Sequence, residues 1–183
     1  HAGVDARRVV ALARAGLQGL VMAGTGNGSV NSKLQEQLAK GLRSIYALHG
    51  DEPLLQQEAA DLIRQTARDQ GYTERHVFTV AGAHFDWESV QAAAGAMSLF
   101  SDKLLMDVRI PSGKPGKEGS VALQALAERM ADQQDVLLLV LLPRLDKTAK
   151  SSGWFMALDN HGATVQLDPI ERAGLPAWIA HRL

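Results

Sequence analysis

The amino-acid sequence predicts an α/β protein whose parallel β-sheet is flanked by helices, and three observations support this fold class. Short runs of aliphatic and β-branched residues alternate with helical patterns about 10 to 18 residues long, which is typical of βαβ units. The run Val136–Leu142 is apolar throughout, as expected for an interior strand covered on both faces. Turn-forming runs such as Gly24–Ser29 and Pro111–Gly119 separate these segments.

The predicted elements follow one another along the chain as alternating helices and strands. Strands are assigned to apolar runs, and helices to stretches whose apolar residues recur every three or four positions. The predicted strands are residues 20–23, 45–48, 76–80, 104–110, 136–142 and 164–167. The predicted helices are residues 9–16, 34–42, 53–70, 87–96, 121–130, 148–158 and 173–183.

Local signals define several of these boundaries. Pro53 stands at the start of a helical pattern, where a proline is tolerated because the first amide has no partner. Asp86 is a good cap for the helix that begins at Trp87, since its carboxylate can accept from the first free amides. Two prolines and three glycines place residues 111–119 in a surface loop.

Composition describes an ordinary globular chain of 183 residues, enough for one domain with a sizeable core or for one domain and an incomplete piece. Hydrophobic residues make up 46% and charged residues 21%, which excludes a disordered protein. The formal net charge of −1 argues against a dedicated nucleic-acid surface. The chain has no cysteine, so disulfides and thiolate metal sites are excluded.

Targeting and membrane signals are also missing from the sequence. No apolar run approaches the roughly 18 to 20 residues needed to span a bilayer. The start His1–Arg8 has neither a Met nor the apolar centre of a signal peptide. We therefore expect a cytoplasmic protein without membrane partners, and a first residue of His indicates a processed, excised or engineered terminus.

Patterns for cofactor binding and catalysis are not found. A phosphate loop would occupy Gly50–Leu55, but Asp51 and Glu52 repel phosphate groups and Pro53 has no amide hydrogen to donate. The segment Gly113–Glu118 is glycine-rich and basic without the phosphate-loop spacing. The six histidines occur in no metal-binding spacing, and no nucleophile motif is present. We expect no cofactor, no metal and no intrinsic catalysis.

Six short blocks carry a resemblance to a known family. They are Tyr46–Leu55, Phe85–Trp87, Met97–Phe100, Leu142–Lys147, Trp154–Phe155 and Leu175–Ile179. In this order they resemble the N-terminal part of the delta subunit of the bacterial DNA polymerase III clamp loader, and the resemblance runs from about residue 34 to 183. It implies the fold of AAA+ ATPases, a branch of the P-loop NTPases, without a functional phosphate loop. The acidic turn at Asp51 agrees with that expectation.

The pair Leu99–Phe100 lies between a helical pattern and a strand pattern. Residue type alone favours burial of both side chains in the core. The resemblance implies otherwise, because in the delta family the Leu-Phe after Met-Ser forms a hydrophobic plug that enters a pocket on the ring-shaped sliding clamp and favours ring opening. The implied clamp-binding residues are Leu99, Phe100, Met97 and Ser98. The implied partners are the clamp and the other clamp-loader subunits, with DNA contacted only indirectly.

The block Pro143–Thr148 follows the apolar strand, at the end where α/β proteins usually place functional loops. Two interpretations remain open for its basic residues. They contact another subunit or DNA, or they form a solvated entry to the next helix.

The first thirty residues carry a second resemblance, through Gly3–Ala6 and Leu20–Val30. These segments resemble the C-terminal domain of bacterial L-asparaginases. In that family the Asn of the A-G-x-G-N-G block helps to contact substrate, and the matching residue is Asn27. The catalytic threonines of the family belong to a domain with no counterpart here, so we expect no asparagine hydrolysis.

The two resemblances divide the chain into three parts: residues 1–30 as an asparaginase-like helix-strand segment, 31–172 as the delta-like AAA+ domain, and 173–183 as the start of a truncated second domain. A junction near Val30 to Lys33 suggests a fusion or chimera. The alternative functions are therefore a folded chimera without native activity and an inactive L-asparaginase fragment. We expect the appended strand to pair with an edge of the sheet or to promote self-association.

Overall fold

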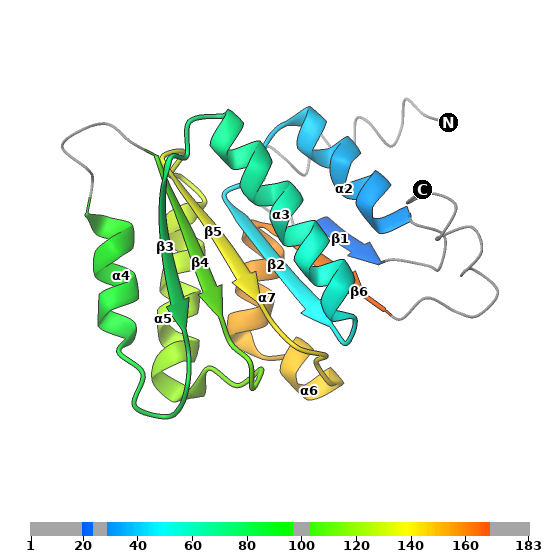
Figure 1. Ribbon diagram of the computed structural model, residues 1–183. Coiled ribbons are helices and arrows are strands. Elements are labelled where there is room, and N and C mark those ends of the chain that lie inside the picture. Colours follow the sequence, from blue (N-terminus) through cyan, green and yellow to red (C-terminus); the bar gives the residue numbers. More distant parts are fainter. Residues whose placement is uncertain (1–19, 24–28, 97–102, 169–183) are drawn as a thin grey trace.

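The computed structural model describes residues 20–23, 29–96 and 103–168. Within these ranges a six-stranded sheet with the order β1-β6-β2-β5-β4-β3 forms, and every pairing is parallel (Figure 1). The strands are β1 Leu20–Ala23, β2 Ile45–Gly50, β3 Glu74–Thr79, β4 Leu104–Arg109, β5 Val136–Leu141 and β6 Ala163–Leu167. The helices are α2 Ser29–Lys40, α3 Pro53–Asp69, α4 Trp87–Gly95, α5 Gly116–Met130, α6 Lys147–Lys150 and α7 Gly153–His161.

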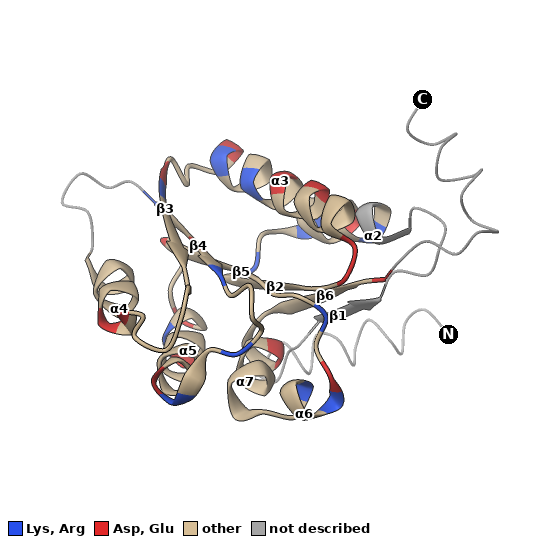
Figure 2. Cartoon of the chain, turned by 60° about the horizontal axis from the view of Figure 1, so that its bottom comes forward, with Lys and Arg blue, Asp and Glu red and all other residues tan. Residues whose placement is uncertain are grey.

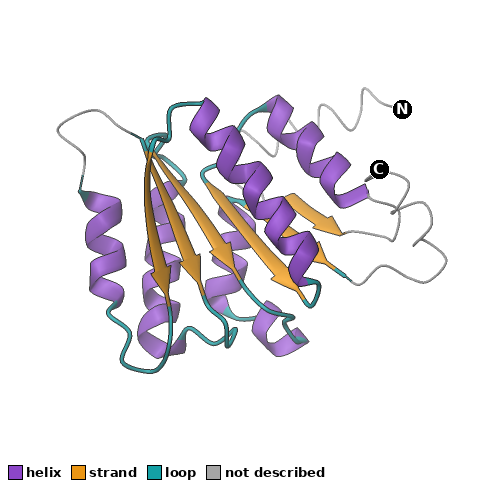
Figure 3. Cartoon of the chain, viewed as in Figure 1, coloured by secondary structure: helices purple, strands orange, loops and turns teal. Residues whose placement is uncertain are grey.

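The helices form two layers, one on each face of the sheet. Helices α2 and α3 cover one face, while α4, α5, α6 and α7 lie on the other (Figures 2 and 3). Because all strands run in the same direction, their carboxyl ends meet at one edge of the sheet and their amino ends at the opposite edge. The predicted α/β class with a parallel sheet is therefore confirmed.

The apolar strand β5 lies between β2 and β4, and its side chains alternate between the two layers. Leu138 and Val140 are fully buried on the α5 side, and Leu137 and Leu139 are fully buried on the α3 side. The prediction of an interior strand covered on both faces is correct. A buried leucine side chain contributes roughly 1.5 to 3 kcal/mol relative to exposure, so β5 anchors both halves of the core.

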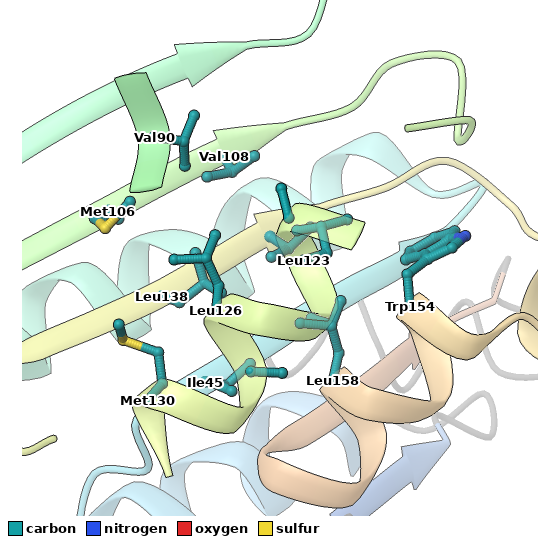
Figure 4. Packing of buried hydrophobic residues seen from close by; sticks show 14 of the residues in the cluster. Ile45, Val90, Met106, Val108, Leu123, Leu126, Met130, Leu138, Trp154 and Leu158 are labelled. Carbon is teal, nitrogen blue, oxygen red and sulfur yellow. The ribbon is translucent and has the colours of Figure 1, made fainter. Parts of the chain in front are cut away.

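The larger core cluster lies between the sheet and helices α5 and α7. Leu123 and Leu126 of α5 face the strands, and Leu158 of α7 packs beside them (Figure 4). On the opposite face, Leu34 of α2 and Ile63 of α3 are fully buried against the sheet. Most of the apolar positions that predicted these helices are buried, whereas Leu54 of α3 and Val121 of α5 are exposed.

Helix α5 begins earlier than predicted. Residues 116–119 were expected in a loop, yet the helix starts at Gly116, directly after Pro115. Gly119 is buried, and a Cβ at this position would lie 2.6 Å from the ring of Trp87. A glycine in a helix usually lowers stability, but here the close packing of α4 on α5 requires it.

The helix predicted for residues 148–158 is two helices. Asp146 caps α6, since its Oδ1 accepts from the amide of Ala149 at 2.7 Å. The Ser151–Gly153 segment then interrupts the helical pattern, because serine and glycine have low helix propensity. Helix α7 starts at Gly153, which is packed against Gln124 of α5.

The segment before residue 31 joins the same sheet. Strand β1 has the predicted bounds and pairs with β6, so of the two expected outcomes the structure shows edge pairing. Helix α2 begins at Ser29, which means that the junction expected near Val30 to Lys33 lies inside a helix. The helices expected at residues 9–16 and 173–183 lie outside the described residues.

Candidate functional site

The predicted clamp-binding residues Met97, Ser98, Leu99 and Phe100 lie outside the described residues, and Asn27 does as well. The described residues on either side of this predicted clamp-binding motif are Ala96 and Lys103. Helix α4 ends before the motif, and strand β4 begins after it. The motif therefore connects two elements whose own positions are known.

Helix α4 is held firmly up to the start of the motif. Asp86 caps it as predicted, because its Oδ1 accepts from the amide of Ser89 at 3.2 Å. Val90 and Ala94 are buried in the core. The amide of Ala96 donates to the carbonyl of Ala92 at 2.8 Å, so the last turn remains helical.

Lys103 is anchored on the other side of the motif. Its Nζ donates to the carbonyl of Gln70 at 3.3 Å and lies 5.1 Å from the centre of the Tyr72 ring, a cation–π distance. Its own carbonyl accepts from the amide of Glu74 at 3.3 Å. The amide of Leu104 donates to the carbonyl of Asp135 at 2.9 Å. The chain that follows the motif is thus attached, from Lys103 onward, to the amino edge of the sheet.

The turn at the predicted phosphate-loop position lies at the opposite, carboxyl edge. Gly50 has a φ of 140°, a conformation that favours glycine, and a Cβ there would overlap the carbonyl oxygen of Leu167. Its amide donates to the carbonyl of Pro143 at 3.3 Å. Pro53 occupies the first turn of α3, as predicted. That this turn binds no nucleotide stays a prediction.

A pocket of about 790 Å³ opens beside this turn, between α3 and the ends of β4 and β5. Its charged lining residues are Arg64, Arg109, Arg144 and Asp51. Gln56 of α3 also lines the pocket. Its Nε2 donates to the carbonyls of Leu48 at 3.3 Å and Leu142 at 2.7 Å, and these bonds connect α3 to the neighbouring strand ends. Figure 2 shows basic and acidic residues interspersed elsewhere on the chain.

Asp107 on β4 is completely buried and contacts three arginines beside this pocket. Its Oδ2 accepts from Arg64 Nη2 and from Arg75 Nη2, each at 2.7 Å. Its Oδ1 accepts from Arg109 Nε at 3.5 Å. Burial alone would raise the pKa of Asp107, but the hydrogen bonds from Arg75 and Arg64 and the charge of Arg64 lower it below the ordinary value.

His49 is a second buried polar residue at the carboxyl edge, with 3% of its surface exposed. Its ring meets that of Phe155 edge-to-face at 5.3 Å. Burial lowers the pKa of His49 to about 4, and the positive charge of Lys150 acts in the same direction. The imidazole is therefore neutral near pH 7.

Sequence reasoning did not identify Asp107 or His49. A signal existed for Asp107, since it is the acidic residue within an otherwise apolar stretch of strand, Leu104–Val108. Its partners could not be found in the same way, because Arg64 and Arg75 are 43 and 32 residues away in the chain.

Within the described residues, no group of three or more His, Cys, Asp or Glu side chains is arranged to hold a metal ion. In the same part of the chain, no helix is long and apolar enough to cross a membrane.

Comparisons with known proteins agree with the resemblance seen in the sequence. Residues 46–168 match the family described as "DNA polymerase III, delta subunit". The DNA polymerase III subunit delta of Escherichia coli (strain K12) is 36% identical over 150 residues, which cover 82% of this chain and 43% of that protein. Its counterpart from Haemophilus influenzae (strain ATCC 51907 / DSM 11121 / KW20 / Rd) is 27% identical over 157 residues, with the same coverage.

The chain thus spans less than half the length of these two relatives. The family match covers the strands from β2 to β6 and every helix from α3 to α7, which are the elements on both sides of the Met-Ser-Leu-Phe motif. The chain belongs to the DNA polymerase III delta-subunit family.

Proposed function

We propose that this chain is a sliding-clamp-binding module of a clamp loader in DNA replication. Leu99 and Phe100 form the hydrophobic plug that enters the clamp, and Met97 and Ser98 complete the contact. Membership of the delta-subunit family supports this proposal, and so does the position of the Met-Ser-Leu-Phe motif inside the matched range 46–168. The other clamp-loader subunits are further partners, and DNA is contacted only through the assembled complex.

The physical basis is that of an interface with few strong anchors. Burying a Leu and a Phe side chain is worth roughly 1.5 to 3 kcal/mol each, and a handful of residues usually carry most of the binding energy. A plug that binds the open ring better than the closed ring shifts the equilibrium toward opening. This step requires no nucleotide on the chain itself.

The structural observation that supports the proposal is the attachment of the described residues on either side of the motif. The amide of Ala96 is bonded to the last turn of α4, and Lys103 is bonded to Gln70 and Glu74. Holding the two ends of a binding segment lowers the conformational entropy that is lost when a partner binds. This arrangement suits a short apolar segment that is presented to another protein.

Surface plasmon resonance with an immobilised sliding clamp and without nucleotide tests the proposal. We expect Phe100→Ala to weaken clamp binding by about tenfold or more, because the variant removes a main apolar anchor. The midpoint of thermal unfolding should stay unchanged, since the plug contributes to the interface and not to the core.

Leu54→Ala is the matched control for Leu99→Ala. Leu54 lies on α3 with 45% of its surface exposed, far along the chain from the motif, and its truncation removes the same apolar group. Clamp affinity should fall for Leu99→Ala and not for Leu54→Ala. Equal affinities of the wild type and Phe100→Ala contradict the plug. Absence of binding by the wild type contradicts the clamp proposal, and the alternative of a folded chimera without native activity further requires that the chain neither binds nucleotide nor releases ammonia from asparagine.

For residues 1–30 we propose common ancestry with the C-terminal domain of L-asparaginases and no hydrolytic role. Asn27 lies outside the described residues, while β1 forms an edge of the sheet beside β6. The part of this segment that supports a structural role is therefore β1, which extends the sheet.

A further inference from the structure

Helices α4 and α5 run side by side, and both end at the amino edge of the sheet. Helix α4 connects the carboxyl end of β3 to the amino end of β4, and α5 makes the same connection from β4 to β5 (Figure 1). The two helices are therefore parallel, and Gly119 near the start of α5 packs against Trp87 at the start of α4. At the other end, the last turn of α4 directly precedes the Met-Ser-Leu-Phe motif.

The guanidinium of Arg129 lies on this last turn of α4. Arg129 belongs to the last turn of α5, and a Cβ built on Gly95 would lie 2.6 Å from its Nη2 and 3.5 Å from its Nη1. Only a residue without a side chain leaves room for the group in this position. Both residues are exposed, so the arginine crosses the surface of α4 and is not part of the core.

The end of α4 has no cation of its own. The last four carbonyl groups of a helix have no partner within it, and this end carries a partial negative charge. The last turn of α4 contains no basic residue, whereas those of α3 and α5 contain Arg68 and Arg129. None of the ion pairs among the described residues involves Arg129. Arg129 therefore supplies, from the neighbouring helix, the positive charge that α4 lacks.

We propose that Arg129 is a positioning residue for the clamp-binding motif, an inference that rests on the proposed function. Its guanidinium stabilises the last turn of α4 and thereby fixes the point from which the motif starts. Helix ends open with free energies close to zero, so a weak contact changes the fraction of molecules in which the turn is formed. The apparent affinity for a partner falls in proportion to the fraction of molecules that are competent to bind. Because Arg129 acts through α4, it need not touch the clamp.

Two measurements on the full chain test this inference. Surface plasmon resonance gives the affinity for the sliding clamp. NMR chemical shifts of Ala94 and Gly95 in the free chain give the fraction of molecules whose last α4 turn is helical. We expect Arg129→Gln to lower the affinity and this helical fraction by the same factor, about threefold, the size of a cation's effect at a helix end. Arg129→Lys keeps the charge and should restore most of both.

Arg68→Gln is the matched control. Arg68 is an exposed arginine in the last turn of α3, which ends at the same edge of the sheet but covers the opposite face (Figure 2). The variant removes the same charge from the chain and leaves the contact on α4 in place. Clamp affinity and the helical fraction of α4 should both stay unchanged.

Gly95→Ala tests the contact from the other side. The added Cβ displaces the guanidinium, while alanine itself favours the helix. Arg129→Gln should therefore weaken clamp binding less in the Gly95→Ala chain than in the wild type, as expected for two residues that act through one contact.

The inference is overturned if Arg129→Gln lowers the affinity and leaves the helical fraction unchanged, because the arginine would then contact the clamp directly. It is also overturned if Arg68→Gln lowers the affinity as much, since net charge alone would explain both losses. If Phe100→Ala weakens binding and Arg129→Gln does not, this inference fails and the clamp proposal stands. If the wild type does not bind the clamp, the clamp proposal fails, and the helical fraction in the free chain still decides whether Arg129 holds α4.

Discussion

Asp107 carries a negative charge inside the sheet, where an unpaired carboxylate would cost several kcal/mol. Arg64 and Arg75 compensate this cost from α3 and β3, so the ion pairs connect three elements that are distant in sequence. A buried ion pair of this kind adds little net stability, but the loss of one partner is expensive because the other charges stay behind.

We expect Asp107→Asn to lower the free energy of unfolding by about 3 to 5 kcal/mol, because Arg64 would keep a mostly buried charge without its main partner. Urea unfolding at pH 7 measures this change. The control is Asp61→Asn, which removes the exposed partner of the same arginine and should cost about 0.5 kcal/mol or less. Similar losses in the two variants would contradict a special role of the buried carboxylate.

The same carboxylate gives stability a pH dependence at low pH. The pKa of Asp107 is lower in the folded protein than its ordinary value of 3.8, so the unfolded chain takes up the proton first as pH falls. The contribution of the Asp107 carboxylate to the free energy of unfolding is complete above pH 3.8. It declines as the pH falls below this value toward the pKa of Asp107 in the folded protein. Asp107→Asn should remove this part of the acid sensitivity, which unfolding measured at several acidic pH values will show.

At the scale of elements, the junction between β2 and α3 shows how a tight turn depends on its neighbour. Gly50 ends β2 with a φ of 140° and packs directly against the backbone of β6 at Leu167. Pro53 then starts α3 with a restricted φ. The turn is defined by contact with a strand that lies more than a hundred residues further along the chain.

We expect Gly50→Ala to lower the free energy of unfolding by about 3 kcal/mol or more, because a Cβ would overlap the Leu167 carbonyl and the backbone conformation is strained. Gly41→Ala is the control that has backbone strain without steric overlap. The φ of Gly41 is 139°, but nothing lies within 4 Å of the added Cβ, so the free energy of unfolding should fall by about 1 kcal/mol. Thermal or urea unfolding measures both. Equal losses would show that backbone strain alone is responsible.

At the scale of the whole molecule, the described flanks of the Met-Ser-Leu-Phe motif and the arginine-lined pocket lie at opposite edges of one parallel sheet. The flanks of the proposed clamp-binding motif are at the amino edge, and the arginine-lined pocket is at the carboxyl edge. The strand β1 extends this sheet by pairing with β6 and forms its outer edge on that side. Sheet edges with free backbone groups invite pairing with other chains.

Deletion of residues 1–23 should promote self-association. The deletion removes β1 and leaves β6 as an edge strand whose side chains Ala163, Val165 and Leu167 are apolar and buried in the intact chain. Size-exclusion chromatography with light scattering should show a larger mass, rising with concentration, than for the full chain. Deletion of residues 1–19 keeps β1 and should not have this effect. The same mass for both deletions would exclude edge protection by β1.

Most elements could be predicted from the sequence because their signals are local. Apolar periodicity located β5 and α3, and the capping residue Asp86 located the start of α4. Predictions failed where a contact overrides local preference. Gly119 reads as a loop residue until the ring of Trp87 is seen packed against it. The break at Ser151–Gly153 was missed because the apolar residues that follow it, from Trp154 to Leu158, continue a helical pattern.

By itself, the sequence determined the α/β class and the order of the elements, and it located the Met-Ser-Leu-Phe motif at Met97–Phe100 for which clamp binding is proposed, because periodicity and short motifs are properties of neighbouring residues. Only the tertiary structure decided which residues meet at the edges of the sheet. The pairing of Asp107 with Arg64 and Arg75, and the convergence of three arginines on one pocket, depend on how the strands are ordered in space. That order results from packing between distant segments, for which no local pattern exists.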